Sequence, residues 1–381
     1  MAFSRAPRRL QVLLDARAGA PVVAGLPCAV RAAFRAGREL SPERIVIAGA
    51  DDAFLRRWSF QFRAAGVPVV GDGSGPGALD ARLPLLALAA DAFPDESGLT
   101  RFLETAENAA AARRALNGRP VAAYARDAAA LGAGTSAPSD VLARALAAPG
   151  EELSAGVFLD ARTPAAAAAS AQVLYARLAK DNDGYLARLD RRLSVALTRL
   201  MLPFPISPNQ VTGASLAIGL IGAWWLAAPS AHTQFLGALT LWFCALLDGC
   251  DGEIARLKHH ITSWGGDFDL MADHVAHLAT FVALPIGVAR LHPGVNWWLP
   301  GVLLVTGFLA CGFSVYWRVL RLPEGERGPR SLVVERIASR DYVYLILALT
   351  AVGHLDWFVW SAALGSHVFW AWLWWPVAAA A

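Results

Sequence analysis

After Pro208 the sequence consists largely of apolar runs separated by short polar connections. Six runs can be delimited, at 209–229, 232–256, 265–289, 296–318, 341–354 and 357–378. About 20 apolar residues in a helix cross the hydrocarbon core of a bilayer, so most of these runs are long enough to span it. The fifth run is short and reaches the length of a span only if flanking residues are included. We therefore predict an integral membrane domain of six transmembrane helices over residues 206–381.

Basic residues between the runs predict the orientation of this domain. Arg256, Lys258, His259 and His260 separate the second and third runs, and Arg318, Arg321, Arg327, Arg330, Arg336 and Arg340 surround the connection from the fourth to the fifth. The opposite side carries little positive charge beyond Arg290. By the positive-inside rule, both termini face the cytoplasm. We expect the bacterial inner membrane as the location.

Residues 1–178 have a different pattern and predict a cytoplasmic α/β domain. Short β-like runs recur at 11–14, 44–49, 67–72, 121–125 and 156–161, and Ala-rich stretches of helical length separate them. This alternation is typical of a largely parallel, Rossmann-like sheet covered by helices. No basic run interleaves with aromatic residues, so we predict no nucleic-acid partner. The four cysteines have no CxxC spacing, which argues against a structural zinc site.

Residues 179–205 join the two parts. From Tyr185 to Leu202 apolar residues recur at helical spacing, with Arg188, Arg191, Arg192 and Arg199 interspersed, before a proline-rich stop. This pattern predicts an amphipathic helix on the cytoplasmic membrane surface. A solvated linker helix is the alternative.

Four carboxylates stand inside the apolar runs, where a charge is costly. Asp248 and Asp251 are three residues apart at the end of the second run, and Asp269 and Asp273 are four apart at the start of the third. Each pair lies on one helix face, and the short turn between the helices brings the faces together. Four converging acids would repel one another unless a cation joined them. All-oxygen ligation favours Mg²⁺ or Mn²⁺, and a structural salt-bridge cluster is the alternative.

Small residues and one arginine accompany these acids. Gly252 and Gly265 leave room for a bulky ligand beside the helix backbones, and Arg256 is suited to bind a phosphate. The pattern Asp248-x-x-Asp251-Gly252-x-x-Ala255-Arg256, eight residues, then Gly265-x-x-x-Asp269-x-x-x-Asp273 resembles the signature of CDP-alcohol phosphotransferases at every defined position. The segment "ISPNQVT" (206–212) is similar to the entry into that family's first span.

The resemblance implies a reaction and roles for these residues. The family transfers a substituted phosphate from a CDP-alcohol, commonly CDP-diacylglycerol, to a second alcohol, with release of CMP. By resemblance, Asp248, Asp251 and Asp269 bind one or two divalent metals, and Asp273 is the general base and a further candidate ligand. Gly252, Ala255 and Gly265 leave room for the cytidine, Asn209 and Thr212 contact the nucleotide, and Arg256 completes the CDP-binding set by holding a phosphate. A homodimer is also implied.

The acceptor site is expected at the cytoplasmic ends of the fourth and fifth runs. Ser314, Arg318, Arg321 and Arg340 lie there and are suited to bind a phosphate on an acceptor such as inositol phosphate or glycerol phosphate. Ordinary positive-inside topology explains the same arginines equally well.

The N-terminal half resembles a sugar- or alcohol-phosphate nucleotidyltransferase, as in fused enzymes that make inositol-phosphate phosphodiesters. The stretch "ALAADAF" is similar to that family's metal-aspartate strand, through Asp91, and "FLDARTP" is similar to its late Asp-x-x-Thr-Pro segment, through Asp160. However, "LLDARAGAPVVAG" lacks the Gly-x-Gly-x-Arg phosphate loop and the lysine that follows it. We therefore expect a degenerate, inactive domain. Three alternatives to a phosphotransferase with an inactive N-terminal domain stay open for the whole protein. They are a bifunctional enzyme that also makes a CDP-alcohol from CTP, a divalent-cation transporter, and an inactive membrane scaffold.

Overall fold

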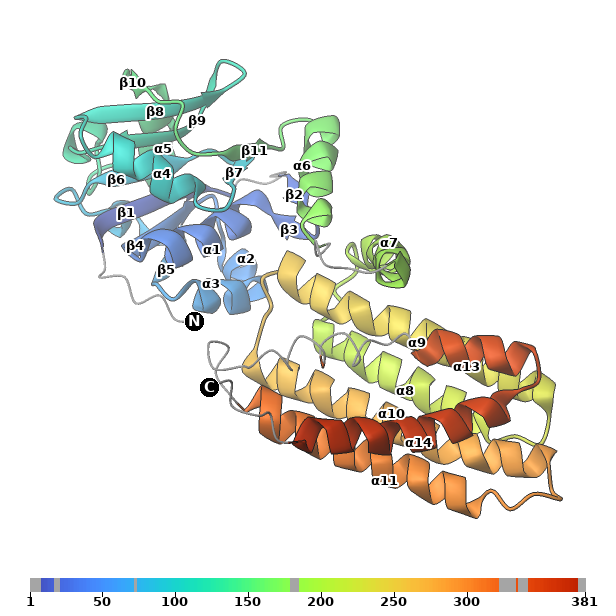
Figure 1. The fold of residues 1–381 in the computed structure, drawn as a ribbon. Coiled ribbons are helices and arrows are strands. Elements are labelled where there is room, and N and C mark those ends of the chain that lie inside the picture. Colours follow the sequence, from blue (N-terminus) through green and yellow to red (C-terminus); the bar gives the residue numbers. More distant parts are fainter. Residues whose placement is uncertain are drawn as a thin grey trace. The chain divides into compact units, whose positions relative to one another are not determined.

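The computed structural model describes residues 8–16, 21–71, 74–178, 185–321, 334 and 342–375 (Figure 1). The chain divides into two compact units. The first comprises residues 1–181, 202–204 and 254–260, and the second comprises 182–201, 205–253 and 261–381. An N-terminal α/β domain and a helical C-terminal region were both predicted, and both are confirmed.

The first unit is built on a seven-stranded mixed sheet of order β10-β8-β9-β6-β1-β4-β5. Its strands are β1 (Arg8–Asp15), β4 (Pro42–Ala48), β5 (Val69–Gly71), β6 (Leu85–Leu88), β8 (Ala111–Leu116), β9 (Arg119–Ala125) and β10 (Glu151–Glu152). Strands β6, β1, β4 and β5 are parallel, whereas β9 is antiparallel to β6 and β8. The parallel part agrees with the prediction, and a Rossmann-like arrangement remains a prediction.

Two short strand pairs lie outside this sheet. Strand β11 (Phe158–Asp160) pairs antiparallel with β7 (Ala92–Pro94), and β2 (Val22–Val23) pairs with β3 (Leu26–Pro27). The run at 156–161 is therefore a strand, but not one of the main sheet. This pairing draws the segment after Asp160 toward the segment that contains Asp91.

Helices cover the sheet. They are α1 (Cys28–Leu40), α2 (Asp52–Arg57), α3 (Ser59–Ala65), α4 (Gly98–Ala106), α5 (Pro138–Ala147) and α6 (Pro164–Ala176), with one-turn helices η2 (Pro76–Ala78) and η3 (Ala129–Leu131). Strands β1 and β6 supply fully buried residues, among them Leu13, Leu14, Leu85 and Leu86. Consecutive residues are buried because both faces of a central parallel strand are covered.

Residues 254–260 pack within the first unit. His259 has a left-handed backbone (φ 49°), and the His260 N–H donates to Ala255 O at 2.8 Å, which closes a Schellman-type helix end. The carbonyl of Leu257 accepts from Arg31 at 3.1 Å, and that of Lys258 accepts from Gln61 at 3.1 Å. Helix-end carbonyls need such donors because no further turn supplies them.

The second unit is helical. Its helices are α7 (Tyr185–Met201), α8 (Pro208–Leu226), α9 (Ala231–Leu257, whose last turn is in the first unit), α10 (Ser263–Leu291), α11 (Trp298–Val315), η4 (Tyr316–Leu320), α13 (Tyr342–Ala351) and α14 (Leu355–Trp374). Within the described residues, three helices are long and apolar enough to cross a membrane: 231–257, 263–291 and 298–318. Helix α13 is apolar but shorter.

Small residues allow close approach of these helices. A Cβ on Gly287 of α10 would meet the carbonyl oxygen of Leu226 in α8 at 2.0 Å, and one on Gly237 of α9 would meet Gly222 O at 2.8 Å. Helices in membranes commonly pack through such residues, because van der Waals contact replaces the hydrophobic driving force available in water. Leu226, Leu284, Ile346 and Val359 lie in the buried core of this unit.

Candidate metal centre

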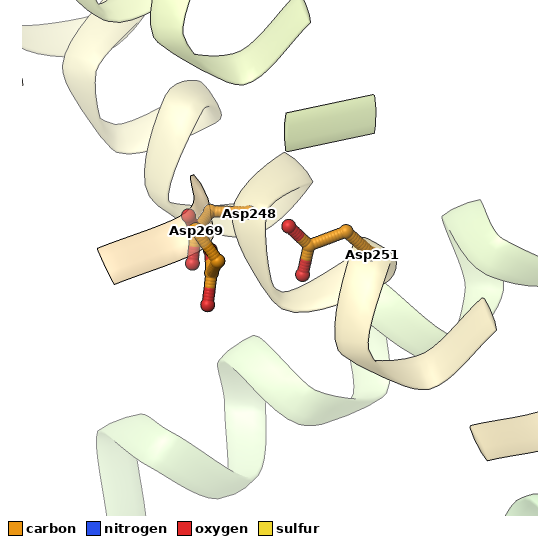
Figure 2. Close-up of side chains that lie close together, drawn as sticks. All are labelled: Asp248, Asp251 and Asp269. Carbon is orange, nitrogen blue, oxygen red and sulfur yellow. The ribbon is translucent and has the colours of Figure 1, made fainter. Parts of the chain in front are cut away.

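Three carboxylates meet where α9 and α10 face each other. Asp248 and Asp251 come from α9 and Asp269 from α10, and one ligand atom from each lies within 4.8 Å of the others. Figure 2 shows the three side chains turned toward a common region. Asp248 and Asp251 are buried, and Asp269 is half-buried. The structure thus brings together three of the four acids singled out in the sequence.

Local structure explains this convergence. Asp248 and Asp251 stand almost one turn apart on α9, which places them on the same face. Helix α10 begins after Thr262, whose hydroxyl accepts the Gly265 N–H at 2.9 Å as an N-terminal cap. Asp269 therefore stands within the first two turns of α10. The intervening turn is short, so both sets of carboxylates lie at the same end of the two helices.

Asp273 lies one turn further along α10 and is outside the group of three. With Asp248 it lines a cavity of about 30 Å³, to which His277 and Tyr342 also contribute. His277 packs edge-on against Phe308 and Tyr342.

The predicted nucleotide-contacting residues of α8 and α10 lie beside the acids. Thr212 is buried, and its hydroxyl donates to Asp251 Oδ2. A Cβ on Gly265 would come within 3.1 Å of Asn209 Oδ1, so these two residues adjoin each other. A Cβ on Gly252 would meet nothing within 4 Å. The backbone at Gly252 is therefore open to a ligand.

Ala255 and Arg256 stand on the last turn of α9, and Arg256 is exposed. They belong to the other compact unit, as does the turn that follows them.

The residues expected at the acceptor site surround the end of α11. Ser314 is fully buried and its hydroxyl accepts the indole N–H of Trp374 at 2.8 Å. The Arg318 guanidinium lies 4.5 Å from the centre of the Trp374 ring, and that of Arg321 lies 4.4 Å from the Trp317 ring. Arg340 is outside the described residues. Ser314 and Trp374 are 60 residues apart, so no local sequence pattern could have indicated their contact.

The donor set fits a hard divalent cation. All three side chains offer carboxylate oxygens, which Mg²⁺ and Mn²⁺ prefer, and the three are close enough to share one ion. Mg²⁺ is usually held by few carboxylates and keeps positions for substrate phosphates.

The sheet domain contains a cavity of about 1000 Å³ that is lined by both aspartates of the nucleotidyltransferase resemblance, Asp91 and Asp160. Asp160 accepts hydrogen bonds from the Arg162 side chain at 2.6, 3.0 and 3.2 Å, from the Arg162 backbone N–H at 3.0 Å, and from Asn117 at 3.3 Å. The bonds from Arg162 lower the pKa of Asp160 to about 2. A carboxylate held in this way already has a counter-charge.

Apolar helices of membrane-crossing length that carry a carboxylate cluster are typical of an integral membrane protein, and the three carboxylates are close enough together to hold a metal ion. Residues 205–379, a little under half of the chain, match the family described as CDP-alcohol phosphatidyltransferase.

Curated relatives carry related names. The chain is 32% identical over 158 residues (41% of this chain and 36% of the relative) to a protein of Rubrobacter xylanophilus named bifunctional IPC transferase and DIPP synthase. It is 30% identical over 111 residues (29% and 44%) to a CDP-diacylglycerol–serine O-phosphatidyltransferase of Helicobacter pylori. It is 29% identical over 103 residues (27% and 41%) to a phosphatidylinositol phosphate synthase of Corynebacterium glutamicum. The matches thus span less than half the length of these relatives.

Among solved structures, the chain is similar to the phosphatidylinositol phosphate synthase of Mycobacterium tuberculosis, crystallised with CDP-DAG bound. The sequence identity is 21% and the TM-score 0.34, with 48% of this chain and 91% of that chain covered. At that TM-score the likeness supports no further statement.

Proposed function

We propose that this protein is a membrane-embedded, Mg²⁺- or Mn²⁺-dependent CDP-alcohol phosphotransferase. It transfers a substituted phosphate from a CDP-alcohol, with CDP-diacylglycerol as the favoured donor, to an acceptor alcohol and releases CMP. The observation that carries the proposal is the convergence of Asp248, Asp251 and Asp269 from two neighbouring helices. The family match over residues 205–379 supports it.

The reaction needs a base, a bound pyrophosphate and a leaving group. Asp273 takes the proton of the acceptor hydroxyl while that oxygen forms a bond to the phosphorus bearing the donor's alcohol. The bond from this phosphorus to the bridging oxygen breaks, and CMP leaves with the electron pair. Asp248, Asp251 and Asp269 would hold the cation, which when bound neutralises the pyrophosphate and the departing CMP. The open backbone at Gly252 leaves space for the nucleotide.

The acceptor is proposed to be a phosphorylated polyol, such as inositol phosphate or glycerol phosphate. Arg318 and Arg321 support this, because each guanidinium lies against an indole ring near the end of α11 and is suited to bind a phosphate. The name of the Corynebacterium relative is consistent with such an acceptor. We further propose six spans, cytoplasmic termini and a homodimer.

The sheet domain is proposed to be an inactive relative of nucleotidyltransferases. The lack of the Gly-x-Gly-x-Arg phosphate loop supports this, and Asp160 of the Asp-x-x-Thr-Pro segment is already paired with Arg162. A second candidate function is a bifunctional enzyme, which the name of the Rubrobacter relative favours. Incubating the full chain with CTP and phosphorylated polyols separates the two. Pyrophosphate release would establish the bifunctional enzyme, and its absence is the result expected here.

The phosphotransfer itself is tested by CMP release in nanodiscs with Mn²⁺. CDP-diacylglycerol is offered with inositol phosphate, inositol, glycerol phosphate or serine. Asp273→Asn should abolish CMP release while largely keeping CDP-lipid binding, because the amide cannot accept the hydroxyl proton. Asp267→Asn is the matched control: Asp267 is exposed on the same helix and should be dispensable. Normal turnover by Asp273→Asn would remove Asp273 from the role of base. Mn²⁺ transport without CMP release would favour the transporter.

A further inference from the structure

The third acidic side chain of α9, Glu253, is buried but does not belong to the carboxylate group at the metal centre. Its side chain has no solvent exposure. Oε1 accepts hydrogen bonds from Ser194 Oγ at 2.6 Å and from Arg191 Nη1 at 3.3 Å. Oε2 accepts one from Thr198 Oγ1 at 2.8 Å. All three donors come from α7.

The donors form one face of α7. Arg191, Ser194 and Thr198 are spaced three and four residues apart, so they follow one another on the same side of the helix. The opposite side carries the exposed leucines Leu189, Leu193 and Leu200. Helix α7 thus turns its polar side toward α9 and its apolar side outward, as a helix seated in a lipid surface would.

A buried carboxylate is a costly way to join two helices. Apolar side chains of similar volume often stabilise such a contact as well or better. What a hydrogen-bonded carboxylate adds is direction, because its two oxygens fix the donors at defined angles. The bonds of Glu253 therefore set the rotation of α9 about its axis relative to α7.

That rotation matters because of where Glu253 stands. It follows Asp251 by two residues, about 200° around the helix, so the two carboxylates project from nearly opposite sides of α9. Asp251 is held on its own side by Thr212 of α8. A carboxylate oxygen lies about 6 Å from the helix axis, so a 10° rotation would move it by about 1 Å. Functional groups must usually be held to within about 0.5 Å.

We propose that Glu253 is a positioning residue, which fixes α9 against α7 and so holds Asp251 in place for the divalent cation. This inference rests on the proposed function for the cation but not on the identity of the acceptor. Glu253 touches neither substrate nor cation. It acts through the orientation of α9.

The test compares Glu253→Ala with Glu253→Gln in the full chain in nanodiscs. Mn²⁺ binding is measured directly, from the paramagnetic resonance signal of the free ion, and melting temperature is recorded alongside. Glu253→Ala should weaken Mn²⁺ binding by about 10- to 100-fold, the usual effect of losing a group that orients a metal ligand. Glu253→Gln should restore it to within a few fold, because the amide oxygen still accepts from Ser194 and the amide N–H₂ donates to Thr198.

Gln234→Leu is the matched control. Gln234 is equally buried on α9 and donates to Ala228 O at 2.8 Å, but it lies 14 residues before Asp248, about 21 Å along the helix. This variant should lower the melting temperature and leave Mn²⁺ binding unchanged. If Glu253→Ala behaves in the same way, the residue is structural and the proposal is overturned.

The two proposals fail in different ways. A wild-type chain that binds Mn²⁺ but releases no CMP with any acceptor would overturn the proposed reaction, while the comparison at Glu253 would still decide the positioning role. The positioning role itself is overturned if the wild-type chain does not bind Mn²⁺, or if its Mn²⁺ binding does not depend on Asp251.

Discussion

Replacing Thr212 by valine removes one hydrogen bond from the carboxylate group and almost no volume. The Thr212 hydroxyl is buried and donates to Asp251 Oδ2, and Pro208 O lies 3.3 Å away as a second acceptor. The single hydroxyl proton fixes the orientation of the Asp251 carboxylate. Valine keeps the shape of the side chain but removes this donor from the Asp251 carboxylate.

The size of the effect follows from the strength of this bond. A hydrogen bond to a charged group contributes about 1.5–3 kcal/mol net. If most of this hydrogen-bond free energy serves to orient Asp251, losing the bond lowers Mn²⁺ affinity about tenfold or more, because 1.4 kcal/mol corresponds to a factor of ten. We expect Thr212→Val to raise both the Mn²⁺ dissociation constant and the Mn²⁺ concentration for half-maximal CMP release by this factor.

Thr350→Val provides the control for this experiment. Thr350 is also buried, but its hydroxyl donates to Ile346 O within α13. Equal Mn²⁺ affinity in the two variants would refute the reasoning, because the bond to Asp251 would then have no influence on the cation.

Two further predictions concern stability. Gly287→Ala should lower the melting temperature by several degrees, because its Cβ would clash with Leu226 O and overpacking costs about 1–3 kcal/mol. Gly213→Ala is the control, since Gly213 faces open space on α8, and it should not lower the melting temperature. Equal melting temperatures of the two variants would contradict the close approach of α8 and α10 at Gly287. Arg177→Met should speed hydrogen exchange in α6 at neutral pH, because the Arg177 guanidinium lowers the pKa of Asp95. A lowered carboxyl pKa stabilises the fold fully above the unfolded value of about 3.9, and this stabilisation is lost as the pH falls through the lowered pKa of folded Asp95, so the difference from wild type should be full at pH 7 and shrink as the pH falls below about 3.9. With Arg177 39% exposed, the pair contributes about 1 kcal/mol, and a difference that stays constant as the pH is lowered would exclude this origin.

The sequence was most informative where the helical repeat determines which side chains lie on the same face. Spacings of three and four residues placed Asp248 beside Asp251, and a short turn brought Asp269 to them. The position of Asp273 outside that group could not be predicted, because it depends on the rotation of α9 and α10. Contacts between distant residues, such as those of Thr212 and Glu253, set that rotation.

The fold shows the same division. Runs of buried β-branched residues and leucine identified the parallel strands β1 and β4, because such strands are covered on both faces. Strand β8, with the sequence "AARRAL", lacks that signature because it lies near the sheet edge, where arginine is tolerated. Each of the six apolar runs contains a helix, and among the residues that the structure describes three helices combine the length and hydropathy of a span. Tryptophan in α14 and small or hydroxyl-bearing residues in α8 lower the hydropathy without preventing burial.

The outward leucines of α7 have a practical consequence for work with the purified protein. Water that reaches the α7–α9 contact competes with Ser194 and Thr198 for the oxygens of Glu253, and electrostatic bonds weaken as the local dielectric constant rises. A lipid layer over Leu189, Leu193 and Leu200 keeps that contact dry, whereas a loosely packed detergent leaves it wet. Under the proposed role of Glu253, the choice of amphiphile would then change the affinity for the divalent cation. Assays in different detergents would report different metal requirements for the same protein.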